Sequence, residues 1–148
     1  MSSFKFTPEA LKHCLSGFPP AGPNAFEWRD GKLHYMQSTP DPGSSWDKEA
    51  DPSQSEWQSF WKECDRIGVW NLPEDFSRPK SVDGLQVRMV LAHNGNSIRS
   101  VGQCWGAPQE VEDTVRAFHF ALQLLVGYHP TSHMNMQPRS RRKPSSQP

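Results

Sequence analysis

The chain has 148 residues, of which 34% are hydrophobic, and it carries equal numbers of basic and acidic residues, 16 of each. This length is typical of one domain, which can bury a core without disulfides or metal ions. Residues 129–148 hold four basic residues and no acidic residue, so residues 1–128 hold twelve basic and sixteen acidic residues, a net charge of −4. An acidic body excludes a broad electrostatic surface for nucleic acid. We expect one globular domain over residues 1–128 and a disordered basic tail over residues 129–148.

The cysteines and the hydropathy pattern indicate a compartment. Cys14, Cys64 and Cys104 are odd in number and far apart, which favours reduced thiols over a disulfide framework or a zinc site. The first residues lack the apolar segment of a secretory signal, and no run approaches the ~18 apolar residues that cross a bilayer. The sequence therefore predicts a cytoplasmic protein that does not enter a membrane.

The first predicted element is a short helix over residues 7–16. Thr7 can cap its N-terminus, Pro8 suits the first helical turn, and Gly17 can end it. An apolar stripe at helical spacing is formed by Ala10, Leu11, Cys14 and Leu15. The proline-rich run at residues 19–23 then prevents the helix from continuing.

Residues 25–36 predict a β-hairpin. Asp30-Gly31 at its centre is a strong signal for a two-residue turn. Folding there puts four apolar side chains on one face, with Trp28 opposite Leu33 and Phe26 opposite Tyr35. Because this register gives a continuous apolar face, we expect both strands to join a sheet.

Residues 38–52 are rich in Pro, Ser and Asp, and they predict a loop. The loop contains four acidic residues, Asp41, Asp47, Glu49 and Asp51. Carboxylates can bind calcium when their spacing fixes the ligand positions, but this loop lacks such a spacing. A solvated acidic loop is therefore the favoured interpretation.

A helix is predicted over about residues 54–67. Ser53 and Glu56 have the spacing of a capping box, and Gly68 follows the last apolar residue as a C-cap glycine does. One helical face carries apolar residues at steps of three and four, namely Trp57, Phe60, Trp61, Cys64 and Ile67. A face so rich in large rings must be covered, so this segment indicates a hydrophobic core.

The remaining elements are a second hairpin and a last helix. Apolar residues alternate over residues 83–93, and Asn94-Gly95 predicts a tight turn that sets Leu91 opposite Ile98. The last helix runs from Pro108 or Gln109 to Val126 and carries the stripe Val111, Val115, Phe118, Leu122 and Leu125. We therefore predict an α+β fold: an antiparallel sheet of four to five strands, in the order ββα-ββα after the first short helix, with helices on one face.

Few residues suggest catalysis or metal binding. Cys104 lies between the second hairpin and the last helix, where a helix dipole could acidify its thiol and His34, His93 or His119 could act as its base. A small buried residue at a tight connection is the favoured reading. His129 and His133 are four residues apart, but Pro130 separates them, so a solvated tail is favoured over a metal site. The common phosphate-binding and hydrolase motifs are absent from the sequence, so we expect no cofactor.

Three tryptophans lie in or beside predicted loops, outside the helical stripes: Trp46, Trp70 and Trp105. Binding residues gather on loops, and tryptophan is favoured where binding energy concentrates. The alternative is that the rings fold inward and cover the core. We keep these three residues as the candidate binding site.

The segment from residue 53 to residue 127 resembles a loosely defined class of small, uncharacterised bacterial proteins. The matching pieces are the tryptophan-bearing helix with Trp57 and Trp61, Asp83-Gly84 before a strand, Ser100-Val-Gly102, and Pro108 before the last helix. Some members of this class look like immunity proteins of contact-dependent toxins. The resemblance implies an α+β fold and a bacterial source, and it carries no settled activity.

These observations together favour a non-enzymatic protein-binding module, immunity-like in form, which is a monomer or a weak homodimer. One alternative is a small enzyme that uses Cys104 or a histidine. A second alternative is a nucleic-acid accessory protein that acts through its tail, where Arg139, Arg141, Arg142 and Lys143 could contact phosphates. No aromatic residues are interleaved with these charges, so nucleic acid is the least favoured partner.

Overall fold

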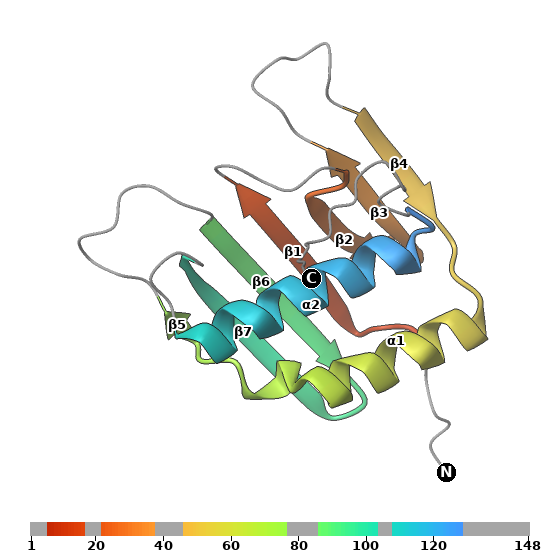
Figure 1. Cartoon of the computed structure of the whole chain (residues 1–148). Coiled ribbons are helices and arrows are strands. Elements are labelled where there is room, and N and C mark those ends of the chain that lie inside the picture. Colours follow the sequence, from red (N-terminus) through yellow and green to blue (C-terminus); the bar gives the residue numbers. More distant parts are fainter. Residues whose placement is uncertain (1–5, 17–21, 38–45, 77–85, 104–107, 129–148) are drawn as a thin grey trace, which may run out of the picture.

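The computed structural model describes residues 6–16, 22–37, 46–76, 86–103 and 108–128, and these residues form one seven-stranded sheet with two α-helices across one face (Figure 1). The strands are β1 (Ala10–Ser16), β2 (Ala25–Arg29), β3 (Lys32–Gln37), β4 (Trp46–Ala50), β5 (Asp75–Phe76), β6 (Gln86–His93) and β7 (Asn96–Gln103). Their order in the sheet is β4-β3-β2-β1-β6-β7-β5, and β5 is parallel to β7 while the other neighbours are antiparallel. The α+β class is confirmed, but the prediction of four to five strands is wrong.

The predicted helix over residues 7–16 is wrong, because residues 10–16 form the central strand β1. Its side chains alternate, with Leu11, His13 and Leu15 buried and the residues between them more exposed. A seven-residue segment can fit both a helical stripe and a strand alternation. Pairing with β2 on one side and β6 on the other decides in favour of the strand.

Both hairpins have the predicted register. Trp28 pairs with Leu33 and Phe26 with Tyr35 across the first turn, while Leu91 pairs with Ile98 across the second. Asp30 and Asn94 have positive φ angles of 57° and 52°, as the first residue of such a two-residue turn requires. The turn residues therefore set the pairing of four strands.

The predicted loop over residues 38–52 is wrong for its second half. Trp46–Ala50 forms the edge strand β4, which pairs with β3. This strand exposes Asp47, Lys48 and Glu49, and such a charged sequence is common at a sheet edge because it discourages pairing with another chain. The Asp83-Gly84 pair of the resemblance, the tail and residues 38–45 lie outside the described residues.

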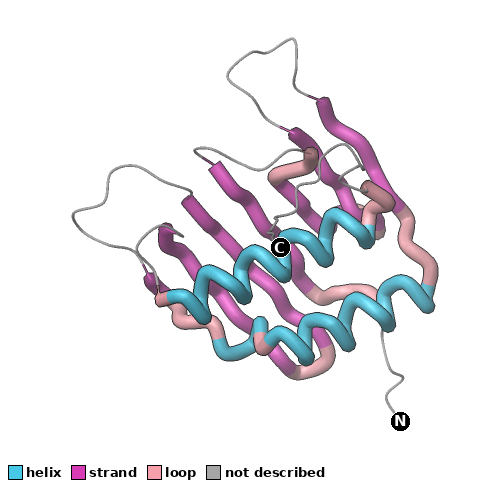
Figure 2. The backbone as a smooth tube through the Cα atoms, in the orientation of Figure 1, coloured by secondary structure: helices cyan, strands magenta, loops and turns pink. Residues whose placement is uncertain are grey.

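The two helices lie where the sequence predicts them. Helix α1 (Gln54–Ile67) has the capping box, since Glu56 N donates to Ser53 Oγ and Ser53 N donates to Glu56 Oε1. Gly68 ends the helix with a φ of 74°, and the short 3-10 helix η2 (Val69–Asn71) follows. Helix α2 (Gln109–Leu125) begins after Pro108. Figure 2 shows α1 and α2 running side by side over the sheet, and the colour order of Figure 1 shows that they run in opposite directions.

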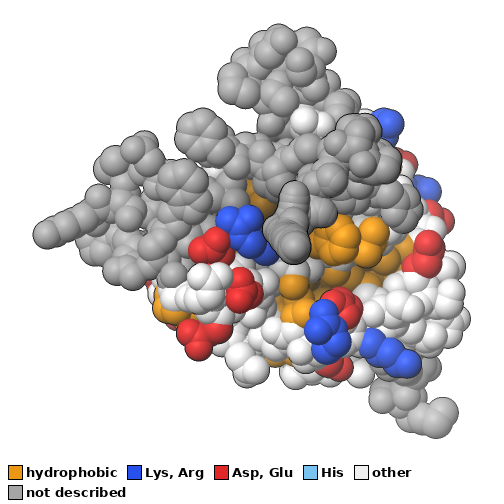
Figure 3. Space-filling model, in the orientation of Figure 1, with side chains coloured by type: hydrophobic (Ala, Val, Ile, Leu, Met, Phe, Trp, Pro, Cys, Tyr) orange, Lys and Arg blue, Asp and Glu red, His pale blue; other side chains and the backbone are white. Residues whose placement is uncertain are grey.

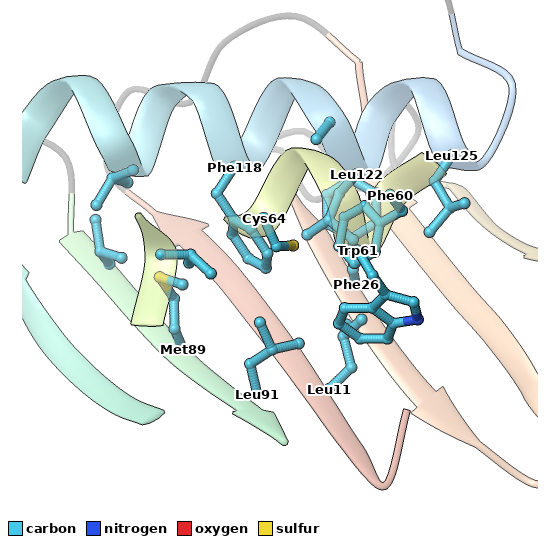
Figure 4. Close-up of a cluster of buried hydrophobic side chains, with 14 of the residues drawn as sticks. Leu11, Phe26, Phe60, Trp61, Cys64, Met89, Leu91, Phe118, Leu122 and Leu125 are labelled. Atoms are coloured by element: carbon cyan, nitrogen blue, oxygen red, sulfur yellow. The ribbon is translucent and has the colours of Figure 1, made fainter. Parts of the chain in front are cut away.

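The hydrophobic core fills the space between the sheet and the helices. Figure 4 shows Phe118, Leu122 and Leu125 pointing from α2 toward the sheet, where Leu11 and Leu91 meet them. Helix α1 adds an aromatic cluster in which Trp57 stacks on Trp61, with ring centroids 5.7 Å apart, and meets Phe60 edge to face. The apolar stripes predicted for both helices are therefore the surfaces that bury the sheet face.

Candidate functional site

A groove of about 460 Å³ lies between α1 and α2, on the side of the helices that faces away from the sheet. Its volume falls in the range of about 300–1,000 Å³ that is usual for binding sites. Figure 3 shows hydrophobic side chains exposed between the helices, with charged side chains around them. The groove is therefore an apolar hollow with a polar border.

Helix α2 supplies the apolar wall of the groove. Phe120 and Leu124 are 48% and 41% exposed, and they are the exposed large hydrophobic side chains of the described part of the chain. They are four residues apart, so they lie one helical turn apart on the same face. The remaining lining residues of this helix are Ala117, Ala121 and Leu125. The small alanine side chains leave space that forms the hollow, and the side chains of Phe120 and Leu124 lie beside it.

Helix α1 supplies the polar wall. Ser55, Ser59, Glu56 and Glu63 line it, and the nearly buried ring of Phe60 lies at its base. The capping box holds Glu56 in place, because Ser53 N donates to Glu56 Oε1 at 2.8 Å. Two hydrogen bonds from the Arg66 guanidinium hold Glu63 and lower the pKa of its carboxyl group. The lining residues thus include two carboxylates and no Lys or Arg.

A buried polar network lies on the inner side of α2. His13 Nε2, from β1, is 3.1 Å from His119 Nδ1, from α2. His119 Nε2 is 3.2 Å from Gln123 Nε2, and Gln123 donates to the carbonyl oxygen of Pro23 at 3.1 Å. The network joins α2 to the centre of the sheet and to the segment that precedes β2.

Both histidines of this network are neutral at pH 7. Burial lowers the pKa of His13 well below 6.5, and the nearby His119 lowers it further. Burial also lowers the pKa of His119 to about 4, although a hydrogen bond with the Pro23 backbone opposes this change. Within the described residues, His13 Nδ1 has no hydrogen-bond partner. The two side chains are 0% and 4% exposed, so a substrate cannot reach them in this conformation.

Of the three residues of the predicted tryptophan site, the structure describes the side chain of Trp70 alone. Trp70 lies in η2, where its ring stacks on Trp61 with centroids 6.4 Å apart and its Nε1 donates to Asp65 Oδ1 at 2.9 Å. The backbone of Trp46 belongs to β4, and Trp105 lies outside the described residues. Trp70 is half-buried and held by its neighbours, and a binding role for the three residues stays a prediction.

Among the residues considered for catalysis, the structure describes the histidines. Cys104 lies outside the described residues, and His93 stacks on Trp61 with ring centroids 3.8 Å apart. His34 is buried, and its Nδ1 lies 3.2 Å from Arg29 Nη2 and 3.9 Å from Glu49 Oε2. Cys64 is a buried free thiol whose pKa is raised by burial. Among the described residues, no three His, Cys, Asp or Glu side chains are close enough together to hold a metal ion.

Comparison with known proteins adds no relative. No protein-family model matches the chain, and no curated protein matches its sequence. Neither described helix has the length and apolar character that a membrane span requires. The resemblance to immunity-like bacterial proteins therefore stays a hypothesis.

Sequence reasoning missed Phe120 and Leu124. A signal was present, because Ala117, Phe120, Ala121 and Leu124 form a second apolar stripe at steps of three and four on α2. Only the docking of α2 shows which stripe faces the sheet and which one lines the groove.

Proposed function

We propose that this protein is a non-enzymatic protein-binding module and that the groove between α1 and α2 is its binding surface. One observation carries the proposal: Phe120 and Leu124 are exposed together, beside a hollow, on a helix whose other apolar face is already buried. Exposed apolar side chains that gather in this way and have a polar border are characteristic of interaction sites.

The composition of the lining supports binding over catalysis. Its side chains include two serines and two glutamates but no His, Cys or Lys that could activate a serine as a nucleophile. The groove is lined by residues of two helices, which is the geometry that accepts the apolar face of a partner helix. An inhibitor of the immunity type is one form of such a module, and the resemblance of residues 53–127 favours that form.

Site-specific photo-crosslinking tests the proposal. A photoreactive amino acid replaces Leu124 in the groove or, as the control, the half-buried Val90 on the open face of the sheet. In cells that produce the protein, we expect a discrete crosslinked species from position 124 and none from position 90. Adding Phe120→Asp should remove that species, because a charge in the apolar wall would have to be desolvated on binding.

Two results would overturn this proposal. The first is the absence of a crosslinked species from position 124. The second is a species that forms at both positions or that persists in the Phe120→Asp variant. Circular dichroism of each variant checks folding, which we expect to be unchanged because Phe120 and Leu124 are outside the core.

A further inference from the structure

We infer that the occupant of the groove is a cationic amphipathic helix of another protein, an inference that rests on the proposed function. The groove offers three constraints on what fills it: the spacing of its apolar side chains, the charge of its border, and the charge of the two helices as a whole. Each constraint is independent of the identity of the partner.

The spacing of the apolar side chains fits a helix. Phe120 and Leu124 are one turn apart, which is a rise of about 6 Å along α2. Between α2 and α1, the small side chains of Ala117 and Ala121 leave room for side chains that enter from the side facing away from the sheet. A helix with apolar residues at steps of three and four would place successive side chains along this hollow, in the way that the ridge of one helix packs into the groove between others.

The charge of the border selects the sign of the occupant. Glu56 and Glu63 are the charged lining residues, and Arg66 contacts Glu63 from the same helix. The whole of α1 and α2 carries six acidic and three basic residues, a net charge of −3. An approaching segment with Lys or Arg beside its apolar face would meet a complementary potential, which favours both its encounter and its orientation.

The same charge disfavours a second copy of this chain as the occupant. Two grooves that face each other would bring together two surfaces of net charge −3 and two pairs of glutamates. Like charges that are brought together across an interface oppose association. The basic tail of this chain has the right sign, with four basic residues in residues 129–148, so it is the competing occupant that the experiment must separate.

The experiment uses two helical peptides of about 14 residues, which is four turns. Both carry Leu at steps of three and four; one has Lys at the flanking positions and the other has Glu. Binding to the full chain is measured by fluorescence anisotropy at low salt and at about 1 M salt. We expect the cationic peptide to bind about tenfold more tightly at low salt, and we expect the difference to vanish at high salt.

Variants of the protein locate the peptide. Phe120→Ala should weaken the cationic peptide about tenfold, as the loss of a central apolar contact does. Glu56→Gln with Glu63→Gln should weaken it about fivefold, and Gln at position 56 preserves the capping box. The control Glu74→Gln changes an exposed carboxylate that does not line the groove, so it should leave the affinity unchanged.

The outcomes separate this inference from the proposed function. If both peptides bind equally and Phe120→Ala weakens both, the groove is a binding site, but the inference that it selects a cationic occupant is overturned. If the cationic peptide fails to bind at about 1 mM, the inference is overturned, and the crosslinking result still decides the proposed function. If the cationic peptide binds only after residues 129–148 are removed, the tail of this chain occupies the groove in the full chain, and the inference that the occupant belongs to another protein is overturned.

Discussion

The buried pair His13 and His119 predicts a loss of stability in weak acid. His119 has a pKa of about 4 in the folded protein against an ordinary value of 6.5, so the unfolded chain binds protons more readily. The stabilising contribution is therefore complete above about pH 6.5 and is lost as the pH falls toward 4. Integrating the difference in bound protons between the unfolded and folded states gives a loss of about 2 kcal/mol in the free energy of unfolding at pH 5, from His119 alone. The lowered pKa of His13 acts in the same direction.

The surroundings of the pair explain why solvent does not reduce this effect. The ring of Phe118 meets His13 edge to face with centroids 5.1 Å apart, and the ring of Phe26 lies 5.7 Å from that of His119. A proton on either imidazole would have to be held among these rings and beside another imidazole, with the Pro23 carbonyl and Gln123 as the polar neighbours. Protonation therefore favours opening of the contact between α2 and β1.

Urea denaturation at several values between about pH 8 and pH 5 measures this loss. His119→Gln removes the titrating group, so the loss of unfolding free energy on acidification should shrink by about 2 kcal/mol relative to the unaltered protein. His34→Gln is the control, because His34 pairs with Glu27 and so lies on the face of the sheet opposite to His13. An equal acid loss in the unaltered protein and His119→Gln would refute the reasoning, whatever the stability of the variant at neutral pH.

Three other changes should alter stability, each measured as the free energy of unfolding in urea. Gly102→Ala should cost about 1–3 kcal/mol, because a Cβ there would lie 2.3 Å from the ring of Phe76 and would displace β5; an unchanged value would contradict that contact. Ser53→Ala should cost about 1 kcal/mol through loss of the capping box with Glu56, and a matching Gln58→Ala on the exposed side of α1 should have little effect. Phe118→Ala should cost about 3–5 kcal/mol, and a loss below 1 kcal/mol would mean that α2 is not packed as described.

The sequence predicted the elements whose signals are local. Asp30-Gly31 and Asn94-Gly95 set the two hairpins, and the residues on either side alternate in step with those turns. Ser53, Glu56 and Gly68 marked both ends of α1 because capping depends on atoms within a few residues. Where an element is determined by residues that lie within a few positions of one another, its structure could be predicted directly from the sequence.

The strands β1 and β4 show where local signals were insufficient. The segment Ala10–Ser16 fits a helical stripe as well as an alternation, and it becomes a strand because β6, more than 70 residues later, pairs along its whole length. The charged strand Trp46–Ala50 has no apolar alternation, and its pairing with β3 makes it the edge of the sheet. Both strands depend on partners that no local pattern identifies.

The groove could not be predicted from the sequence for a related reason. Helix α2 is apolar on two sides, and an amphipathic helix of a globular domain normally needs only one apolar face. Val115, Phe118 and Leu122 face the sheet, while Phe120 and Leu124 remain exposed beside α1. Phe120 and Leu124 do not belong to the buried core, so packing of the described core does not account for them. A partner that covers Phe120 and Leu124 would account for them, and this is why the groove, more than the predicted tryptophans, is the surface at which binding should first be tested.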